Sequence, residues 1–504
     1  MSSLNRHSSF TPLSYLFLSG LTLSLAGCGS SSSDSSASYV MFYNASQNSP
    51  GIHLTIDEDL ETSEDDEVEV TFSAIDYGET LTRAEFEAKT YTYELAWQDD
   101  DSRDRDDLEM IHQSELQFNN DTLHFIVLSD DIQQPTVNVY DIPIIDEEDD
   151  DTYDRFNVRI LNLHEQESNV DLYISETDET FNEATLVTSA SFNGLTDNQK
   201  LDQGSYILYL TRSGESDVLF KSNDVSFSYS AQYILSIREN VGAGGSPFVI
   251  DRISNSTTAE YTDVDSEAQF TIYNAIATHE LLEGYQGTVD VEINGNPDMP
   301  IVTDLAIGEL SESITTGNGD YSIDVTANGT NVNLLKNHLL SLPENTNRTL
   351  FLYADEEAVD EDGDGDVDED GDGLIDEKEV NVYSLVVDNS VIDGIYSHQV
   401  SIVNLIDTDD FGSVTVYFVK SDETIDTASN SSTLAFSSND VVTLNNNTYQ
   451  VFVVARENSS DMILNSFELV LNEQSNNQFL VLELDENTPT GYRATLVDQA
   501  EVQQ

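Results

Sequence analysis

The stretch DEDGDGDVDEDGDGLIDEKE, residues 360–379, carries a carboxylate on twelve of its twenty residues. With Asp368 as position one of a twelve-residue loop, oxygen ligands fall at positions one, three, five, seven, nine and twelve: Asp368, Asp370, Asp372, the Leu374 carbonyl, Asp376 and Glu379. Gly373 at position six supplies the sharp turn, and Glu379 can close the loop with both oxygens. Hard oxygen ligands at this spacing predict a calcium site.

An incomplete copy of the same pattern precedes this loop. Asp360, Asp362 and Asp364 repeat its first three acidic positions, but Gly371 stands where the closing carboxylate should be. The sequence therefore leaves open whether one or two calcium ions bind. The alternative to a calcium site is a solvated acidic loop that holds no specific ion.

The loop resembles the EF-hand loop and, more closely, the Asp-rich calcium repeats of the thrombospondin type 3 and dockerin families. It departs from the EF-hand because VNVYSLVV, which is typical of a strand, follows Glu379 where a helix would be needed. The resemblance therefore implies a structural calcium ion as cofactor and puts a helix-opening sensor in doubt.

Other motifs give little sign of catalysis. The sequence has no GxSxG, and its HELLE and HEQES segments, at His279 and His164, lack the second His of a zinc helix. With 96 acidic residues, no glycosidase pair can be singled out. We expect a non-enzymatic protein without catalytic residues; the alternative is a carbohydrate-binding accessory protein or a glycoside hydrolase with an unrecognised carboxylate pair.

The first residues are typical of a secretory signal. An apolar run from Leu13 to Ala26 ends in LAGC, whose Cys28 is the one cysteine of the sequence. This closely resembles the bacterial lipobox, which implies cleavage after residue 27 and lipidation of Cys28. The Ser-rich residues 28–38 then read as a flexible tether, and Gly29 after the cysteine favours the outer membrane.

Composition limits the partners. The formal net charge of -78 disfavours nucleic acid and anionic lipid surfaces, because both are polyanions. Such a charge also fits disorder, yet 38% of the residues are hydrophobic and occur in strand-like runs. We therefore expect a folded acidic protein.

An internal repeat organises the rest of the chain. Alternating strands end at a marker Asn in each copy: Asn44, Asn162, Asn274 and Asn404. A second marker, a Tyr about 45 residues further on, is Tyr91, Tyr206, Tyr321 or Tyr449. We expect each Asn to cap a turn through its side chain. Each Tyr is expected to pack in the core with its hydroxyl at the edge, as in a tyrosine corner.

Short strands bounded by Gly, Asn, Asp and Pro predict an all-β fold of four tandem antiparallel Ig-like β-sandwiches. The expected ranges are 39–145, 152–254, 268–397 and 398–504. Loop lengths in the repeat place the acidic stretch, residues 355–379, as an insertion into one hairpin of the third sandwich. The whole pattern resembles bacterial cell-surface lipoproteins with tandem β-sandwich domains of unknown function.

These features together favour an outer-membrane lipoprotein, held by the lipid on Cys28, that serves adhesion or contacts with the envelope matrix. Its expected partners are the membrane and a glycan or protein ligand at the cell surface. The ligand, the oligomeric state and the choice between surface and periplasmic orientation are not encoded in the patterns above.

Overall fold

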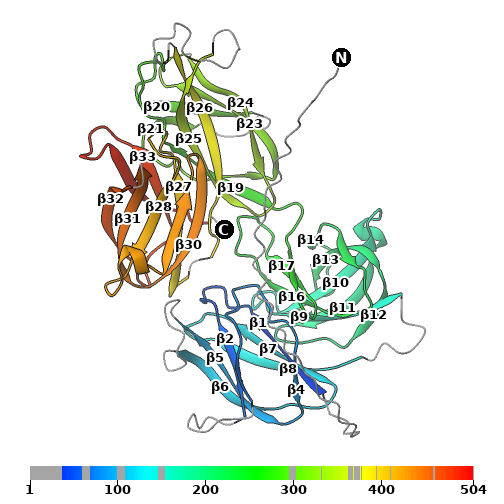
Figure 1. Cartoon of the computed structure of the whole chain (residues 1–504). Coiled ribbons are helices and arrows are strands. Elements are labelled where there is room, and N and C mark those ends of the chain that lie inside the picture. The colour runs from blue at the N-terminus through cyan, green and yellow to red at the C-terminus, as the bar shows by residue number, and fades with distance from the viewer. Residues whose placement is uncertain are drawn as a thin grey trace, which may run out of the picture. The chain divides into compact units, whose positions relative to one another are not determined.

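The protein is described by a computed structural model that covers residues 37–58, 68–98, 108–145, 154–294, 302–330, 332–360, 367, 375, 377–392, 394–408, 410–457 and 460–502 (Figure 1). All of them belong to one compact part of the chain, Ala37–Gln504. Regular structure in these residues is β-strand apart from two short 3-10 helices. The fold is all-β, as the sequence predicts.

The strands group into four repeat units. The first unit contains β1 (Ala37–Asn44), β2 (His53–Asp57), β3 (Glu69–Thr71), β4 (Ala84–Glu87), β5 (Thr90–Trp97), β6 (Glu109–Gln117), β7 (Thr122–Ser129) and β8 (Thr136–Pro143). The second contains β9 (Arg155–Asn162), β10 (Asn169–Glu176), η2 (Phe181–Glu183), β11 (Thr185–Ser191), β12 (Gln199–Asp202), β13 (Gly204–Arg212), β14 (Val218–Lys221), β15 (Val225–Phe227), β16 (Gln232–Glu239), β17 (Phe248–Ile253) and β18 (Thr258–Tyr261).

The third unit contains β19 (Glu267–Asn274), β20 (Thr288–Asn294), β21 (Val302–Ala306), β22 (Ile314–Gly317), β23 (Gly319–Ala327), β24 (Asn333–Leu342), β25 (Asn347–Ala358) and β26 (Lys378–Asp388). The fourth contains β27 (Ser397–Asn404), β28 (Val414–Val419), η3 (Ile425–Thr427), β29 (Asn430–Leu434), β30 (Ser438–Asn445), β31 (Thr448–Glu457), β32 (Ser460–Val470), β33 (Gln478–Leu484) and β34 (Tyr492–Asp498).

Each unit pairs two sheets in the same topology. In the first unit the strand orders are β4-β1-β7-β8 and β3-β2-β5-β6, and the fourth unit repeats them as β30-β27-β33-β34 and β29-β28-β31-β32. Pairing is antiparallel except that the opening strand of each unit lies parallel to a late one, as β1 does to β7. In the second unit β18 extends one sheet beyond residue 254, where the sequence predicts the unit to end.

The two sheets of each unit enclose an apolar core. In the third unit, for example, Phe270 and Leu350 from one sheet pack with Val291 and Ile323 from the other, and all four are fully buried. Fully burying one such side chain contributes about 1.5–3 kcal/mol. The other three units have equivalent clusters, so each copy of the repeat has a core of its own.

The marker asparagines cap turns, as predicted. In every unit the side-chain oxygen accepts a hydrogen bond from the backbone N–H two residues later, at 3.2, 3.0, 3.1 and 3.1 Å for Asn44, Asn162, Asn274 and Asn404. Each side-chain amide also donates to a backbone carbonyl of a more distant segment. Because all four residues are buried, these bonds satisfy polar groups that would otherwise be costly to bury.

The tyrosine-corner prediction is confirmed in three units. The hydroxyls of Tyr206, Tyr321 and Tyr449 donate to the backbone carbonyl four residues earlier, at 2.6, 2.6 and 2.9 Å. In the first unit Tyr91 occupies the same place and is 1% exposed. The rings pack in the core while the hydroxyls close a short turn at its edge.

The opening strands differ from the alternating pattern that the sequence predicts. In β1 and its parallel partner β7, nearly every residue is buried, including neighbours that point to opposite faces. The reason is that the outer face of this sheet packs against the second unit: Tyr43 and Phe125 share a buried cluster with Leu161 and Ile234. The third and fourth units pair in the same way through Tyr273, Phe351, Val403 and Phe479.

The corners themselves can be tested. Replacing Tyr449 by Phe keeps the ring in the core but leaves the Asn445 carbonyl without its hydroxyl donor. We expect the free energy of unfolding to fall by about 1 kcal/mol, measured by urea denaturation. Tyr229→Phe is the matched control, because Tyr229 is 75% exposed and should give no measurable change. Equal stability of both variants would contradict this account of the corner.

Candidate functional site

Most residues of the predicted sites lie outside the described residues. These are the lipidation candidate and seven of the nine calcium candidates: Cys28, Asp362, Asp364, Asp368, Asp370, Asp372, Leu374 and Asp376. The structure describes the remaining two, Asp360 and Glu379, at the base of the loop. Calcium binding and lipidation therefore stay predictions.

The two strands on either side of the acidic stretch form one hairpin. β25 and β26 pair antiparallel over their whole length, from Arg348 opposite Asp388 to Ala358 opposite Lys378. One further backbone bond, from the Val359 N–H to the Glu377 carbonyl at 3.0 Å, closes the end of the ladder. The ladder therefore includes residues 355–358 and 378–379, which the sequence interpretation assigns to the insertion.

Glu379 belongs to a row of carboxylates on one face of this hairpin. It lies directly opposite Glu357 across the ladder, and its Oε1 accepts a 3.0 Å hydrogen bond from Asn381 Nδ2. Like charges directly opposite each other destabilise a strand pair. Glu357 accepts a 2.9 Å hydrogen bond from the Tyr383 hydroxyl, and that bond is the main cause of a raised pKa for Tyr383.

Asp355 continues the row and meets a carboxylate of the fourth unit. Burial, together with the charge of Asp407 and a hydrogen bond to it, raises the pKa of Asp355 to about 6. Asp407 is held in place because its Oδ2 accepts a 2.9 Å bond from the Glu356 backbone N–H. One proton shared by two facing carboxyls relieves their repulsion.

On the opposite face of the hairpin, Glu356 is neutralised by two bases. It pairs with Lys378 on the neighbouring strand and lies 3.1 Å from His279 Nε2. The hydrogen bond from Lys378 is the main reason that its pKa is lowered. Glu356 is therefore a carboxylate at neutral pH, and the hairpin base contains fixed ion pairs beside a protonatable pair.

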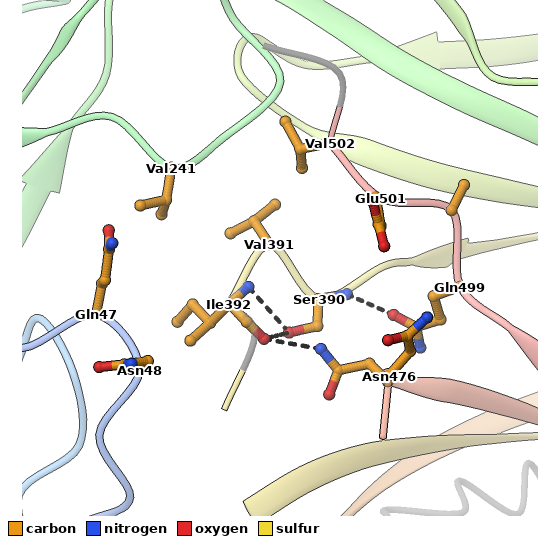
Figure 2. Close-up of a pocket in the computed structure, with 12 residues that line it drawn as sticks. Gln47, Asn48, Val241, Ser390, Val391, Ile392, Asn476, Gln499, Glu501 and Val502 are labelled. Carbon is orange, nitrogen blue, oxygen red and sulfur yellow. Dashed lines mark hydrogen bonds between the residues drawn. The ribbon is translucent and has the colours of Figure 1, made fainter. Parts of the chain in front are cut away.

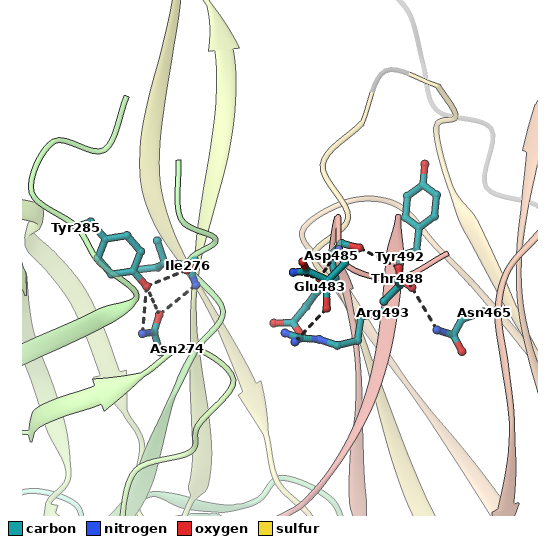
Figure 3. A network of polar contacts seen from close by, with 10 residues as sticks. Asn274, Ile276, Tyr285, Asn465, Glu483, Asp485, Thr488, Tyr492 and Arg493 are labelled. Atoms are coloured by element: carbon teal, nitrogen blue, oxygen red, sulfur yellow. Dashed lines mark hydrogen bonds and ion pairs between the residues drawn. The ribbon is translucent and has the colours of Figure 1, made fainter. Parts of the chain in front are cut away.

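A cleft of about 220 Å³ opens between the third and fourth units beside this base. Its polar lining is His279, Glu356, Asp407, Glu483 and Arg493, and its apolar lining includes Ala275, Ile307, Val380 and Leu405. Glu483 pairs with Arg493 at 2.9 Å. Burial raises the pKa of Glu483, while the charge of Arg493 opposes the shift. Figure 3 shows this ion pair with Asp485, facing the capped turn of Asn274 and Tyr285.

A second cavity, of about 310 Å³, lies where the segment that connects the third and fourth units meets Gln47 and Asn48 of the first unit and Val241 of the second (Figure 2). The Ser390 backbone N–H donates to Gln499 Oε1 at 2.8 Å, and Asn477 Nδ2 donates to the Ile392 carbonyl at 2.7 Å. Of its lining residues only Glu501 is titratable. These hydrogen bonds hold the connecting segment against the end of the fourth unit. The lining residues do not include an acid–base pair.

The described part of the chain shows no group of three or more His, Cys, Asp or Glu arranged to hold a metal ion. Burial raises the pKa of Asp355, and the Asp407 carboxyl lies close enough that its charge and hydrogen bonding add to the shift. Glycosidase carboxyls stand about 5–9.5 Å apart to admit the substrate or water, so this pair does not match that geometry. Within the same described residues, no helix has the length and apolar character to cross a membrane.

The sequence patterns did not identify the residues of the cleft. His279 drew attention only as an incomplete zinc motif, and Asp407, Glu483 and Arg493 carry no local signature. They come together because the third and fourth units pack against each other. A spacing rule that applies within one unit cannot predict such a contact. The available signal was the apolar run VMFY in the opening strand of the first unit, which indicates burial on both faces. The opening strands of the later units lack such a run, because Arg159, Thr271 and Ser401 interrupt it.

Comparisons with known proteins add little. No family model and no curated protein matches the sequence. Among solved structures, one described as the Bacillus anthracis TIE protein is 10% identical, with a TM-score of 0.15, over 88% of this chain and 67% of that chain. Another, a product complex of the multi-modular glycogen-degrading pneumococcal virulence factor SpuA, is 9% identical with a TM-score of 0.16. It is matched over 84% of this chain, which spans 37% of its length. TM-scores this low carry no argument about function; the strands themselves show the fold, tandem β-sandwiches.

The protonatable pair generates a pH prediction. Because the pKa of Asp355 is raised on folding, its stabilising contribution is full below the unfolded value of about 4 and is lost as pH rises through about 6. Asp355→Asn removes the charge. The free energy of unfolding of this variant minus that of the wild type should therefore increase between pH 4.5 and 7.5, with an inflection near pH 6. Urea denaturation across this range measures it.

Asp407→Asn should show a smaller pH dependence of the same sign, because it leaves the burial of Asp355 in place and removes only a charge that adds to the raised pKa of Asp355. The double variant should add little to Asp355→Asn alone. A stability difference that stays flat between pH 4.5 and 7.5 would show that the pair does not titrate there.

Proposed function

We propose that this chain is a non-enzymatic lipoprotein of the outer membrane that presents paired β-sandwich units for adhesion or for contacts with the envelope matrix. A calcium ion stiffens one hairpin of the third unit. Lipid on Cys28 is the anchor, and a glycan or protein is the ligand. The observation that carries the proposal is that both ends of the acidic loop join one hydrogen-bonded hairpin.

The geometry of that base supports a structural ion. Both ends of the loop are held by one hydrogen-bonded hairpin, which continues to Val359 and Glu377. An ion bound between them orders a projection whose two stems are already fixed. Fixed stems lower the loop-closure entropy that ion binding must overcome, so a loop of acidic residues becomes a rigid extension of the sandwich.

Calcium would also relieve a repulsion inside the described hairpin. Glu379 supplies position twelve of the predicted loop and faces Glu357 across the ladder. Coordinating both oxygens of Glu379 to a divalent cation neutralises one member of that like-charged pair. The stabilisation then reaches past the loop to the row of carboxylates that ends at Asp407 in the fourth unit.

The calcium part can be tested by hydrogen exchange and titration calorimetry on the purified protein. We expect binding at about 10⁻⁴–10⁻³ M, with slower exchange in residues 355–379 when calcium is present. Asp372→Ala combined with Glu379→Gln should abolish both effects. Asp178→Asn combined with Glu215→Gln, which removes two exposed charges from the second unit, should leave them unchanged. No heat at millimolar calcium would leave only the solvated-loop interpretation.

Anchoring and display can be tested separately on intact cells. Fatty-acid labelling should mark the wild-type protein, and Cys28→Ser should release it from the membrane. Protease added to intact cells should cleave the displayed chain, and faster after chelation, because the emptied loop becomes accessible. A chain that resists protease with and without chelator would contradict surface display, and a membrane-bound Cys28→Ser protein would contradict the lipid anchor.

A further inference from the structure

The cleft between the third and fourth units has a counterpart between the first and second. Both are lined by the residues one and three positions after each marker Asn: Ala45, Gln47, Leu163 and Glu165 in one cleft, and Ala275, Ala277, Leu405 and Asp407 in the other. Both also contain the residue that follows the parallel partner of the second marker, Arg238 or Glu483. The chain therefore contains one inter-unit cleft twice, with opposite charge at its centre.

In the first cleft the central charges are bonded within the protein. Arg238 donates to Asp251 at 2.7 Å and to the Tyr77 hydroxyl at 2.8 Å, and it also pairs with Glu260. Asp251 in turn accepts a hydrogen bond from the Tyr43 hydroxyl. The guanidinium that the chain itself supplies thus satisfies two carboxylates and a tyrosine.

In the second cleft the central carboxylate is only half satisfied. Glu483 Oε2 accepts from Arg493, but Glu483 Oε1 finds no hydrogen-bond partner among the described residues, although the side chain is 6% exposed. The hydroxyl of Tyr273, the counterpart of Tyr43, is buried and likewise has no partner in this part of the chain. A buried carboxylate oxygen left without a donor is costly, so this cleft lacks a hydrogen-bond donor that its twin contains.

The surroundings define what the donor must be. Glu356 and Glu483 in the lining are paired with bases, and Asp407 adds a further negative charge, which favours a cation. The walls formed by Ala277, Ile307, Val380 and Leu405 favour methylene groups. A metal ion needs several oxygen or nitrogen ligands, and the described residues offer no such group. The cleft volume of about 220 Å³ far exceeds the ~30 Å³ that one water molecule occupies in the liquid, so the cleft has room for a larger group than one water.

We propose that the cleft between the third and fourth units binds a primary alkylammonium group, which donates to Glu483 Oε1 while its carbon chain lies along the apolar wall. Asp407 contributes negative charge at the side of the cleft that meets the hairpin. The group comes from a small free amine or from a lysine side chain of a partner. Glu483 and Asp407 both lie outside the predicted calcium loop, so the cleft can be tested while that loop is empty.

The test is a ligand-detected NMR titration of the purified full chain with n-butylammonium at physiological salt and with chelator present. We expect saturable binding. Tetramethylammonium has the same charge but no N–H donor, and it should bind at least about tenfold more weakly, since a hydrogen bond to a charged group is worth about 1.5–3 kcal/mol. N-acetyl-lysine-methylamide, a lysine with its backbone capped, distinguishes the sources: it binds if the cleft admits a protein side chain, and only the free amine binds if it does not.

Two variants locate the site. Glu483→Gln keeps the shape but removes the accepting charge, and binding should weaken about tenfold or more. Asp407→Asn leaves the ion pair of Glu483 and Arg493 in place and should weaken binding several-fold by charge alone. Glu165→Gln is the matched control, because it changes the corresponding position of the other cleft and should leave affinity unchanged. Thermal unfolding of each variant shows whether its units remain folded.

Three results would overturn the proposal. The first is no saturable binding of n-butylammonium by the wild-type protein. The second is equal binding of tetramethylammonium, which would indicate a general attraction to an acidic surface. The third is unchanged affinity in both Glu483→Gln and Asp407→Asn while each variant stays folded. None of these results bears on calcium binding by the acidic loop, which is measured without the amine.

Discussion

The parallel strand pair at the centre of one sheet in every unit constrains the rest of the structure. β1 with β7, and the equivalent pair in each later unit, are buried on both faces. A sandwich can cover only the inner face, and an exposed apolar outer face would be a liability in water. The outer faces of the first and second units therefore cover each other, and those of the third and fourth do the same. The repeat is fourfold in sequence, while its packing unit is a pair.

The pairing of units buries polar groups among apolar side chains. The two pairs of units satisfy the hydrogen bonds of these groups differently. Between the first and second units Arg238 satisfies the buried Asp251. Asp251 also accepts a hydrogen bond from the Tyr43 hydroxyl, and Arg238 donates one to the Tyr77 hydroxyl. Removing one partner of such a pair leaves an uncompensated charge, which typically costs 3–5 kcal/mol. Between the third and fourth units Glu483 stands at the position of Arg238, and its partner comes from the next strand. The same arrangement of strands thus contains one cleft whose central charge is fully hydrogen-bonded and one cleft whose central charge is only partly hydrogen-bonded.

Sequence patterns predicted the features that depend on nearby residues. The marker asparagines bond two residues ahead and the corner tyrosines four residues back, so their roles can be inferred from short spacings. The all-β fold and the hairpin that carries the acidic stretch followed from strand periodicity and loop length. The surroundings of Asp355 and Tyr273 could not be inferred this way, because Asp407 and Glu483 come near them only through packing between units. Apolar runs such as VMFY and FIVL indicate burial on both faces, yet they do not say which unit covers them.

The hairpin of β25 and β26 connects the acidic loop with the contact between the third and fourth units. Its tip carries the acidic loop, and its base carries Asp355 and Glu356, which lie against Asp407 of the fourth unit. Glu356 also lines the cleft. A continuous ladder joins the two ends, so charge added or removed at Glu379 acts on Glu357 and then on the pair formed with Asp407. Electrostatic influence over these few residues stays within about 10 Å, the screening length at moderate salt. Calcium bound by the loop, as proposed above, would therefore act on the contact between the third and fourth units through one strand pair.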